Sequence, residues 1–363
     1  MSDWEARAQS AGLAYITEFA VGLSRQKCGK GFKFVDADGN AVACKITRKR
    51  CIELVIPPAW KDVWICVDPE GHIQATGVDD AGRKQYIYHP RWHEASAAHK
   101  YGRLRLFGSY LQQIRRRVNM DLKGTELEKK RVVAAVVRLL DKACIRIGNK
   151  QYLQANDSRG ATTLTSDHIC RNSGEIALNF KGKSGKQIEL KCNDEELSAV
   201  IEDCEKSDGE FLFSYLNDKQ EYAPVTSSDV NSYLLEVTKE SITAKDFRTW
   251  RGSVIALTEL AKMPSGLSKT AKKKFVVQAV KQAAAALGNT PAVCRQSYIH
   301  SAILASAEDA SLTNLMRNLE TATDYRKPGL SRAEARLFTF LTHLETGGGF
   351  TVKRRRRVAE QAA

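Results

Sequence analysis

The strongest constraint on the fold is a change of residue pattern that occurs early in the chain. Before it, short apolar runs such as 31–35 and 63–67 are separated by turn residues, a pattern typical of antiparallel strands. From residue 94 onward, apolar residues recur every three or four positions, a spacing typical of amphipathic helices. The sequence therefore predicts an α+β protein with a β-rich domain at 1–96 and a larger, mostly helical domain at 97–350.

Length and charge narrow the class of protein. The chain has 363 residues, of which 43% are hydrophobic and 27% charged, so a globular protein with two domains is expected. Its net charge of +14 favours a polyanionic partner, either nucleic acid or an acidic membrane surface. No apolar run reaches the roughly 20 residues of a membrane helix, and the first residues lack the pattern of a signal peptide. We expect a cytoplasmic protein.

Neither the cysteines nor the acidic turn at 36–40 indicates a metal site. The nine cysteines are scattered and form no CxxC pair, so no zinc site or disulfide framework is expected. The turn has the Asp-x-Asp-x-Asn spacing of a calcium loop. However, Ala41 stands where that loop needs glycine, and Thr47 stands where it needs glutamate. We predict no metal and no cofactor.

The first domain is expected to consist of short antiparallel strands. Residues 36–40 form a turn signal between strands at 31–35 and 41–44. Further strands are expected at 52–56 and 63–67, where apolar residues are dense between turn residues.

A later strand of this domain carries a candidate surface for DNA. Alternation along a strand places Lys84, Tyr86 and Tyr88 on one face. One cation and two aromatic hydroxyl groups fit the phosphates and base edges of a groove. The alternative is a packed strand with a solvated lysine, and the pattern alone does not separate the two.

Two helices open the second domain. The segment 104–118 is amphipathic and basic, and 132–147 has a stripe of apolar residues. One more step of that stripe reaches Arg146, which would aim a charge inward. Alternatively, Arg146 is a cation in the last helical turn, favoured by the helix dipole before a stop at Gly148.

A basic hairpin tip is predicted at 181–186, between strands at 175–180 and 187–190. Its Gly-Lys-Ser resembles the end of a phosphate-binding P-loop. That interpretation fails because Ala177 occupies the earlier glycine position and because a strand, not a helix, follows. A lysine on this tip could reach a phosphate leaving group, or it could simply solvate the turn.

The last third of the chain carries the candidate nucleophile. Helices are expected at 227–235, at 243–262 with Arg248 near its start, and at 269–286. Thr290 and Pro291 then predict a helix start that places Tyr298 about two turns into the helix. By itself this means little, because a tyrosine on a helix is more often a half-buried packing residue than a nucleophile.

Together, Arg146, Arg248, a tip lysine and Tyr298 form the set that metal-free phosphodiester transesterification needs. A tyrosine oxygen attacks phosphorus, cations hold the charge on the non-bridging oxygens, and an acid protonates the departing sugar oxygen. Arginine suits the clamp because it is planar and stays charged. The basic tail at 351–363 is predicted to be disordered, acting as non-specific electrostatic attachment to DNA or as an interaction signal.

With these segments in hand, the chain resembles the type IB DNA topoisomerases, specifically the small bacterial and poxvirus-type enzymes. The resemblance covers nearly the whole length, and its specificity lies in the order of the motifs. It is carried by residues 29–40, 56–60, 74–77, 82–88, 146–149, 160–164, 180–186, 245–250 and 288–298. The implied fold is that of the tyrosine recombinases and type IB topoisomerases, with a small hairpin sheet in the helical catalytic domain.

The resemblance also implies residue roles. Tyr298 would be the nucleophile, Arg146 and Arg248 the clamp on the scissile phosphate, and Lys183 the general acid. Asn289 stands where many relatives have a histidine that donates to a non-bridging oxygen, and asparagine can donate but cannot titrate. Positions that touch DNA in the family correspond here to Gln85, Tyr86, Tyr88 and Tyr152.

The implied activity is relaxation of supercoiled duplex DNA through a 3′-phosphotyrosyl intermediate, without ATP or metal. A monomer that clamps double-stranded DNA and associates with the bacterial nucleoid is expected. One alternative is a tyrosine recombinase. In that family a histidine usually stands three residues before the second arginine, whereas here Lys245 precedes Arg248. The other alternative is a basic DNA-binding protein that has lost activity.

Overall fold

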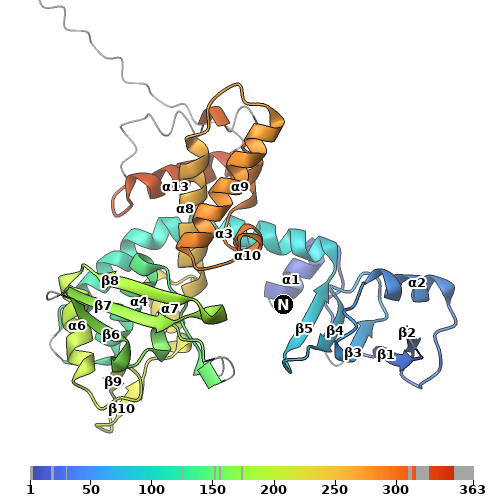
Figure 1. Ribbon diagram of the computed structural model, residues 1–363, viewed down its shortest axis with the longest axis horizontal. Helices are drawn as coiled ribbons and strands as arrows, with labels where there is room; N and C mark the ends of the chain where they lie inside the picture. Colours follow the sequence, from blue (N-terminus) through green and yellow to red (C-terminus); the bar gives the residue numbers. More distant parts are fainter. Residues whose placement is uncertain are drawn as a thin grey trace, which may run out of the picture. The chain divides into compact units, whose positions relative to one another are not determined.

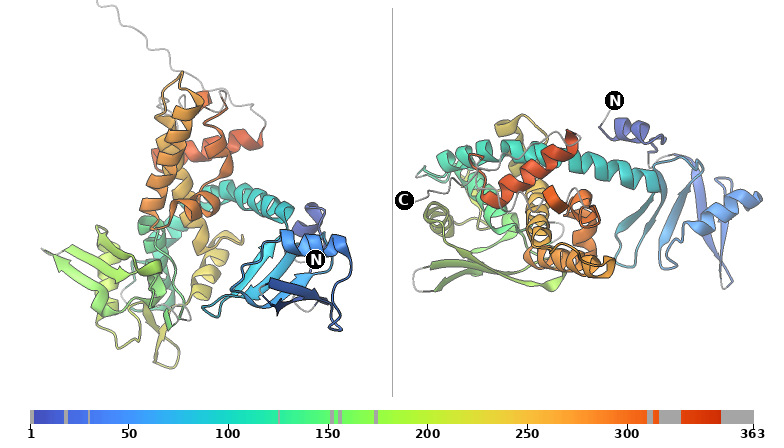
Figure 2. Two further views of the ribbon diagram at one scale, coloured as in Figure 1. Left: turned by 45° about the vertical axis from the view of Figure 1, so that its right-hand side comes forward. Right: turned by 90° about the horizontal axis from the view of Figure 1, so that it is seen from above.

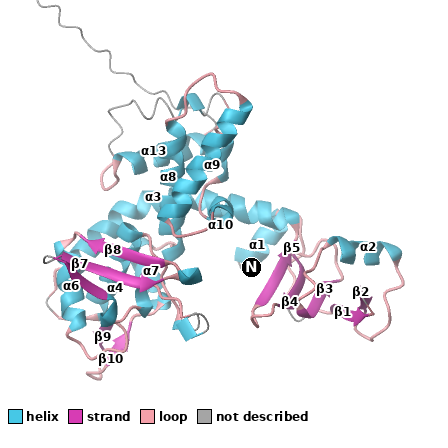
Figure 3. Ribbon diagram, viewed as in Figure 1, coloured by secondary structure: helices cyan, strands magenta, loops and turns pink. Residues whose placement is uncertain are grey.

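The computed structural model describes residues 3–17, 20–29, 31–124, 126–150, 153–154, 157–172, 175–309, 313–315 and 327–346. The chain divides into two compact units after Gly102. The first is built around strands and the second mainly from helices (Figure 3). Among the described residues, no helix combines the length and the apolar character needed to cross a membrane.

The first unit contains one antiparallel sheet, with strands in the order β2-β1-β3-β4-β5 (Figure 1). Leu23, Val63, Ile65 and Ala75 project from its strands into a small core that Cys51 completes. The elements of this unit are α1 (Asp3–Ser10), β1 (Gly22–Cys28), β2 (Gly31–Val35), α2 (Lys45–Glu53), β3 (Lys61–Cys66), β4 (Ile73–Val78) and β5 (Lys84–Tyr88).

Two predictions for this sheet were wrong. Of the strand expected at 52–56, residues 52 and 53 are the end of helix α2, and residues 54–56 follow it without forming a strand. The helix places Cys51 in the core, and Arg50 donates a 2.8 Å hydrogen bond to Gln74 Oε1. The partner of β2 is β1, a strand that sequence reasoning missed, and residues 41–44 contribute only a single bridge from Ala41 to Val35. The turn predicted at 36–40 is present, since Asp36 N donates to Asn40 O at 2.9 Å.

The second unit is a helical bundle with a three-stranded sheet, β6-β7-β8, and a small hairpin, β9-β10. Helix α3 (Pro90–Asp121) begins in the first unit and continues into the second. The other elements are α4 (Lys129–Ala143), η1 (Ala161–Thr163), η2 (Ser166–His168), β6 (Ile169–Asn172), β7 (Glu175–Lys181), η3 (Lys183–Gly185), β8 (Gln187–Cys192), α6 (Glu195–Glu205), β9 (Ser214–Leu216), β10 (Tyr222–Pro224), α7 (Ser227–Thr238), α8 (Ala244–Ala261), α9 (Lys269–Ala286), α10 (Pro291–Ser297), α11 (Ser301–Ala305) and α13 (Arg332–Glu345).

Helix α4 is the centre of this unit. Residues 131–140 are buried without interruption, because α6, α7 and α8 all pack against the helix. Helices α8 and α9 run side by side, and α13 also packs on α8 (Figure 2). The fold class predicted from the sequence is therefore confirmed: an antiparallel N-terminal sheet precedes a larger helical part that carries small sheets.

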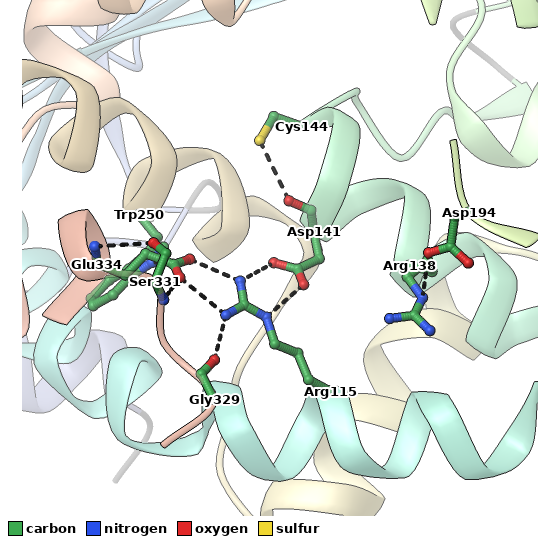
Figure 4. Close-up of polar contacts among 9 residues, drawn as sticks. All are labelled: Arg115, Arg138, Asp141, Cys144, Asp194, Trp250, Gly329, Ser331 and Glu334. Carbon is green, nitrogen blue, oxygen red and sulfur yellow. Dashed lines mark hydrogen bonds and ion pairs between the residues drawn. The ribbon is translucent and has the colours of Figure 1, made fainter. Parts of the chain in front are cut away.

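A partly buried ion network ties four of these helices together. Arg115 of α3 donates to Asp141 of α4 at 2.7 Å and to Glu334 of α13 at 2.8 Å (Figure 4). Trp250 of α8 adds a 3.2 Å bond from its indole nitrogen to Glu334. Burial alone would lower the pKa of Arg115, but hydrogen bonds and the charges of both carboxylates outweigh it and raise that pKa. The network therefore holds a fully compensated arginine.

Candidate active site

Tyr298 lies at the end of a short helix. Thr290 caps α10 by accepting a 3.4 Å hydrogen bond from Val293 N, and Pro291 occupies the first turn, as the sequence predicted. The helix ends at Ser297, so the partly buried Tyr298 is its C-terminal cap and not a residue inside it. Its N–H still donates to Cys294 O at 2.9 Å.

Helix α8 holds this end of α10 closely. A Cβ atom at Gly252 would lie 2.4 Å from the carbonyl oxygen of Tyr298, so only glycine allows this approach. One residue further along α8, Ser253 Oγ accepts a 3.0 Å hydrogen bond from His300 N. Ile299, between the two contacts, is fully buried. The backbone just after Tyr298 is thus held against α8 on both sides of Ile299.

Arg248 comes from the first turns of the same helix and is buried. One of its terminal nitrogens donates to the carbonyl oxygen of Cys144, and the other donates to Leu287 O at 2.6 Å. Its guanidinium carbon lies 5.1 Å from the centre of the Tyr298 ring. Arg248 therefore links the end of α4, the end of α9 and the tyrosine.

The sequence suggested that Arg146 lies on the apolar stripe of α4 or in its last turn. In the structure it lies in neither place, because the helix ends before it. The helix ends at Ala143, Cys144 takes a left-handed conformation with φ of 54°, and Arg146 follows in a segment without regular secondary structure. That segment is held from the side: Ala161 N donates to Arg146 O at 2.9 Å. A Cβ at Gly160 would lie 2.6 Å from that same oxygen, so glycine is needed here too.

Asn289 lies two residues after Leu287 and contacts Arg146. Its side-chain oxygen accepts a hydrogen bond from Arg146, and its backbone N–H donates to Ala284 O at 2.9 Å. The residue is 7% exposed. Among the described residues, its side-chain Nδ2 has no hydrogen-bond partner, and neither does Arg248 Nε. Two buried donors are thus left over next to Tyr298 and Arg146.

The charged groups that meet in this cluster are two arginines, Arg146 and Arg248. Burial lowers the pKa of Arg146, the neighbouring charge of Arg248 lowers it further, and Tyr298 acts in the opposite direction. The guanidinium group of Arg146 stays protonated at neutral pH. Within the part of the chain that the structure describes, neither arginine forms a salt bridge with a carboxylate. Two partly desolvated cations without a counter-charge make a site suited to an anion.

The predicted hairpin with a basic tip is present as β7, η3 and β8. Lys183 is exposed at its tip. Lys186, another lysine of the tip, contacts the site: its Nζ donates to the carbonyl oxygen of Asn289 at 3.3 Å. Sequence reasoning counted Lys186 among the three tip lysines but gave it no role, because spacing along a hairpin does not show which tip residue meets a distant loop.

The residues proposed for DNA in the first unit lie on strand β5, at the edge of the sheet. Lys84 Nζ is 5.8 Å from the centre of the Tyr86 ring, and the rings of Tyr86 and Tyr88 stack with their centres 5.8 Å apart. Gln85 points to the other face, where its Nε2 donates to Asp79 at 2.8 Å. Tyr86 is 37% exposed, whereas burial raises the pKa of Tyr88. Tyr152 lies outside the described residues.

Comparison with known proteins gives consistent matches. Residues 89–324 match the family model described as the catalytic core of eukaryotic DNA topoisomerase I, and residues 31–79 match that of the N-terminal domain of bacterial DNA topoisomerase IB. The DNA topoisomerase 1B of Acanthamoeba polyphaga mimivirus is 31% identical over 286 residues, which cover 77% of this chain and 85% of that protein. The DNA topoisomerase 1B of Vaccinia virus (strain Copenhagen) is 25% identical over 248 residues, covering 66% of this chain and 74% of that protein. These matches do not favour the recombinase alternative.

Proposed function

This chain belongs to the family of type IB DNA topoisomerases, and on that premise we propose that it relaxes supercoiled duplex DNA by cutting and rejoining one strand. The phenolic oxygen of Tyr298 attacks the phosphorus of the scissile phosphodiester. A bond forms between that oxygen and phosphorus, and the bond from phosphorus to the 5′ oxygen breaks. The ester energy is retained in the 3′-phosphotyrosyl bond, so rejoining needs neither ATP nor a metal ion.

We assign the charge-stabilising roles to Arg146, Arg248 and Asn289. The observation that supports this proposal most is the uncompensated positive charge beside Tyr298, together with the unpartnered donors of Arg248 and Asn289. A non-bridging phosphate oxygen is the acceptor such donors require, and it gains negative charge in the transition state. Asn289 fulfils by hydrogen bonding alone a role that a histidine could fulfil in either protonation state.

Lys183 is proposed as the general acid. It would transfer a proton from its ammonium group to the 5′ oxygen as that oxygen departs, and would take a proton back during rejoining. Its position at the exposed tip of the hairpin leaves it accessible to a bound strand.

The remaining assignments concern DNA binding and organisation. Lys84, Gln85, Tyr86, Tyr88 and Tyr152 would contact the duplex, with phosphate contacts giving most of the affinity. The proposed arrangement is a monomer that clamps DNA with domains 1–96 and 97–350, assisted by the basic tail 351–363. A cytoplasmic, nucleoid-associated location and the absence of any cofactor are part of the same proposal.

A plasmid relaxation assay in excess chelator, with and without ATP, tests the proposed reaction. Wild-type protein should relax the plasmid in both conditions, and Tyr298→Phe should abolish relaxation while leaving DNA binding largely intact. Trapping the protein on DNA with denaturant should yield a covalent adduct only when Tyr298 is present. Relaxation by the Tyr298→Phe protein would refute the assignment of the nucleophile.

A further inference from the structure

The turn that joins α9 to α10 is held by three cations from three separate parts of the second unit. Arg248 of α8 donates to Leu287 O, Arg146 from the segment after α4 donates to Asn289 Oδ1, and Lys186 of the hairpin donates to Asn289 O. This turn follows the C-terminal end of α9, an 18-residue helix whose dipole places negative partial charge there. The family assignment gives Lys186 no role.

Asn289 is the residue on which these contacts depend. Its backbone N–H, its backbone oxygen and its side-chain oxygen all have partners, which are Ala284, Lys186 and Arg146 respectively. Nδ2 is the polar atom left without a partner among the described residues. The contacts therefore fix both the position of Asn289 and the orientation of its amide group, because Arg146 can bond only to the oxygen of that amide.

We propose that Lys186 is a positioning residue, which holds Asn289 so that Nδ2 faces the scissile phosphate. The proposal rests on the role proposed above for Asn289. Lys186 acts at the backbone of Asn289 and not on the phosphate itself. The same bond ties the hairpin to the α9–α10 turn, so the hairpin tip that carries Lys183 and the turn that carries Asn289 are held together.

Lys181 provides a matched control on the same hairpin. It lies at the end of β7, and its Nζ forms a 3.5 Å ion pair with Asp157, away from Asn289. Replacing either lysine by methionine removes one positive charge from the hairpin and leaves a side chain of similar length. A general loss of attraction for DNA should therefore be alike in both variants, whereas a loss of positioning should appear only at Lys186.

The test measures DNA affinity and the single-turnover rate of covalent adduct formation separately. Lys186→Met should lower the cleavage rate about tenfold relative to Lys181→Met, the effect expected for loss of one charged hydrogen bond, with equal DNA affinity. Lys186→Arg should restore most of the rate, because a guanidinium can donate to the same carbonyl. Equal rates for the two methionine variants, or no rescue by arginine, would overturn the proposal.

A double-mutant cycle with Asn289→Ala separates positioning from independent action. If Lys186 acts through Asn289, adding Lys186→Met to the Asn289→Ala protein should lower the rate less than twofold, although the same change lowers the wild-type rate about tenfold. Fully additive effects would show that Lys186 acts elsewhere. Failure of the topoisomerase mechanism itself would look different, because Tyr298→Phe would then still form the adduct.

Discussion

The Arg115 network and the Arg146–Arg248 cluster place arginines in similarly buried surroundings of the same unit, yet they compensate the charge in opposite ways. Arg115 is met by Asp141 and Glu334, both nearly buried. Among the described residues, the hydrogen bonds of Arg146 and Arg248 go to neutral oxygens, those of Asn289, Cys144 and Leu287. The difference indicates that Arg115 stabilises the fold, whereas Arg146 and Arg248 are suited to bind an external anion.

The reason lies in the cost of burying a charge. A desolvated cation is stable when carboxylates surround it, and the lost hydration is then replaced within the protein. Carbonyl and amide oxygens replace only part of it, so positive potential remains at Arg146 and Arg248. In the proposed reaction, a phosphodiester would supply the missing charge. Substitutions that change either the Arg115 network or the Arg146–Arg248 cluster, one at a time, test this difference.

The largest effect is expected on stability at Arg115. Arg115→Met would leave Asp141 and Glu334 buried without a cation, which should lower the free energy of unfolding by about 3–5 kcal/mol. Denaturant titration measures this change. Arg105→Met is the control, because its pair with Glu345 is exposed and should contribute under about 1 kcal/mol. Folded Arg115→Met protein should still cleave DNA, and a selective loss of cleavage without destabilisation would contradict the comparison.

The next effect concerns cleavage at Arg146. Arg146→Ala should slow covalent adduct formation about a hundredfold or more, because a donor to the developing phosphate charge is removed. Stability should change little, by about 1 kcal/mol, since the change removes one hydrogen bond to Asn289 and no ion pair. Single-turnover cleavage and denaturant titration on the same protein decide this. A large loss of stability at unchanged cleavage would place Arg146 with Arg115 as a structural residue.

The smallest effect is expected when a carboxylate is added to the Arg146–Arg248 cluster, so that it resembles the Arg115 network. Asn289→Asp puts a carboxylate beside Arg146 and removes the Nδ2 donor. It should slow cleavage about tenfold more than Asn289→Ala, which removes the donor without adding charge, because a phosphate would then compete with a fixed anion. Thermal unfolding should show no loss of stability relative to Asn289→Ala. If the aspartate variant cleaves as well as the alanine variant, uncompensated charge is not what the site provides.

Much of the helical unit was predictable from the sequence. The helix predicted at 269–286 has the observed bounds of α9, and the one predicted at 243–262 differs from α8 by one residue at each end. The start of α10 followed from Thr290 and Pro291. These features depend on the spacing of apolar residues and on capping groups within one segment, so the local sequence is enough to predict them.

The wrong predictions concern elements whose ends depend on contacts with distant segments of the chain. Periodicity alone carried α4 on to residue 147, but the helix ends at Ala143, where Arg248 binds the carbonyl of Cys144 and the segment from Arg146 onward bonds to residues 160–162. Likewise, residues 52 and 53 were predicted to belong to a strand at 52–56, because apolar residues are dense there. They belong to α2, whose Cys51 and Arg50 find their partners in the sheet.

The sequence by itself determined the order of β-rich and helical parts, the basic hairpin and the chemical types of residue in the candidate site, because each of these is a local property. Only the tertiary structure decided that Lys186 donates to Asn289, that Arg146 and Arg248 have no carboxylate partner among the described residues, and that Asn289 Nδ2 has no partner among them. Those facts depend on which side chains meet across more than a hundred positions of the chain, and no local pattern encodes them.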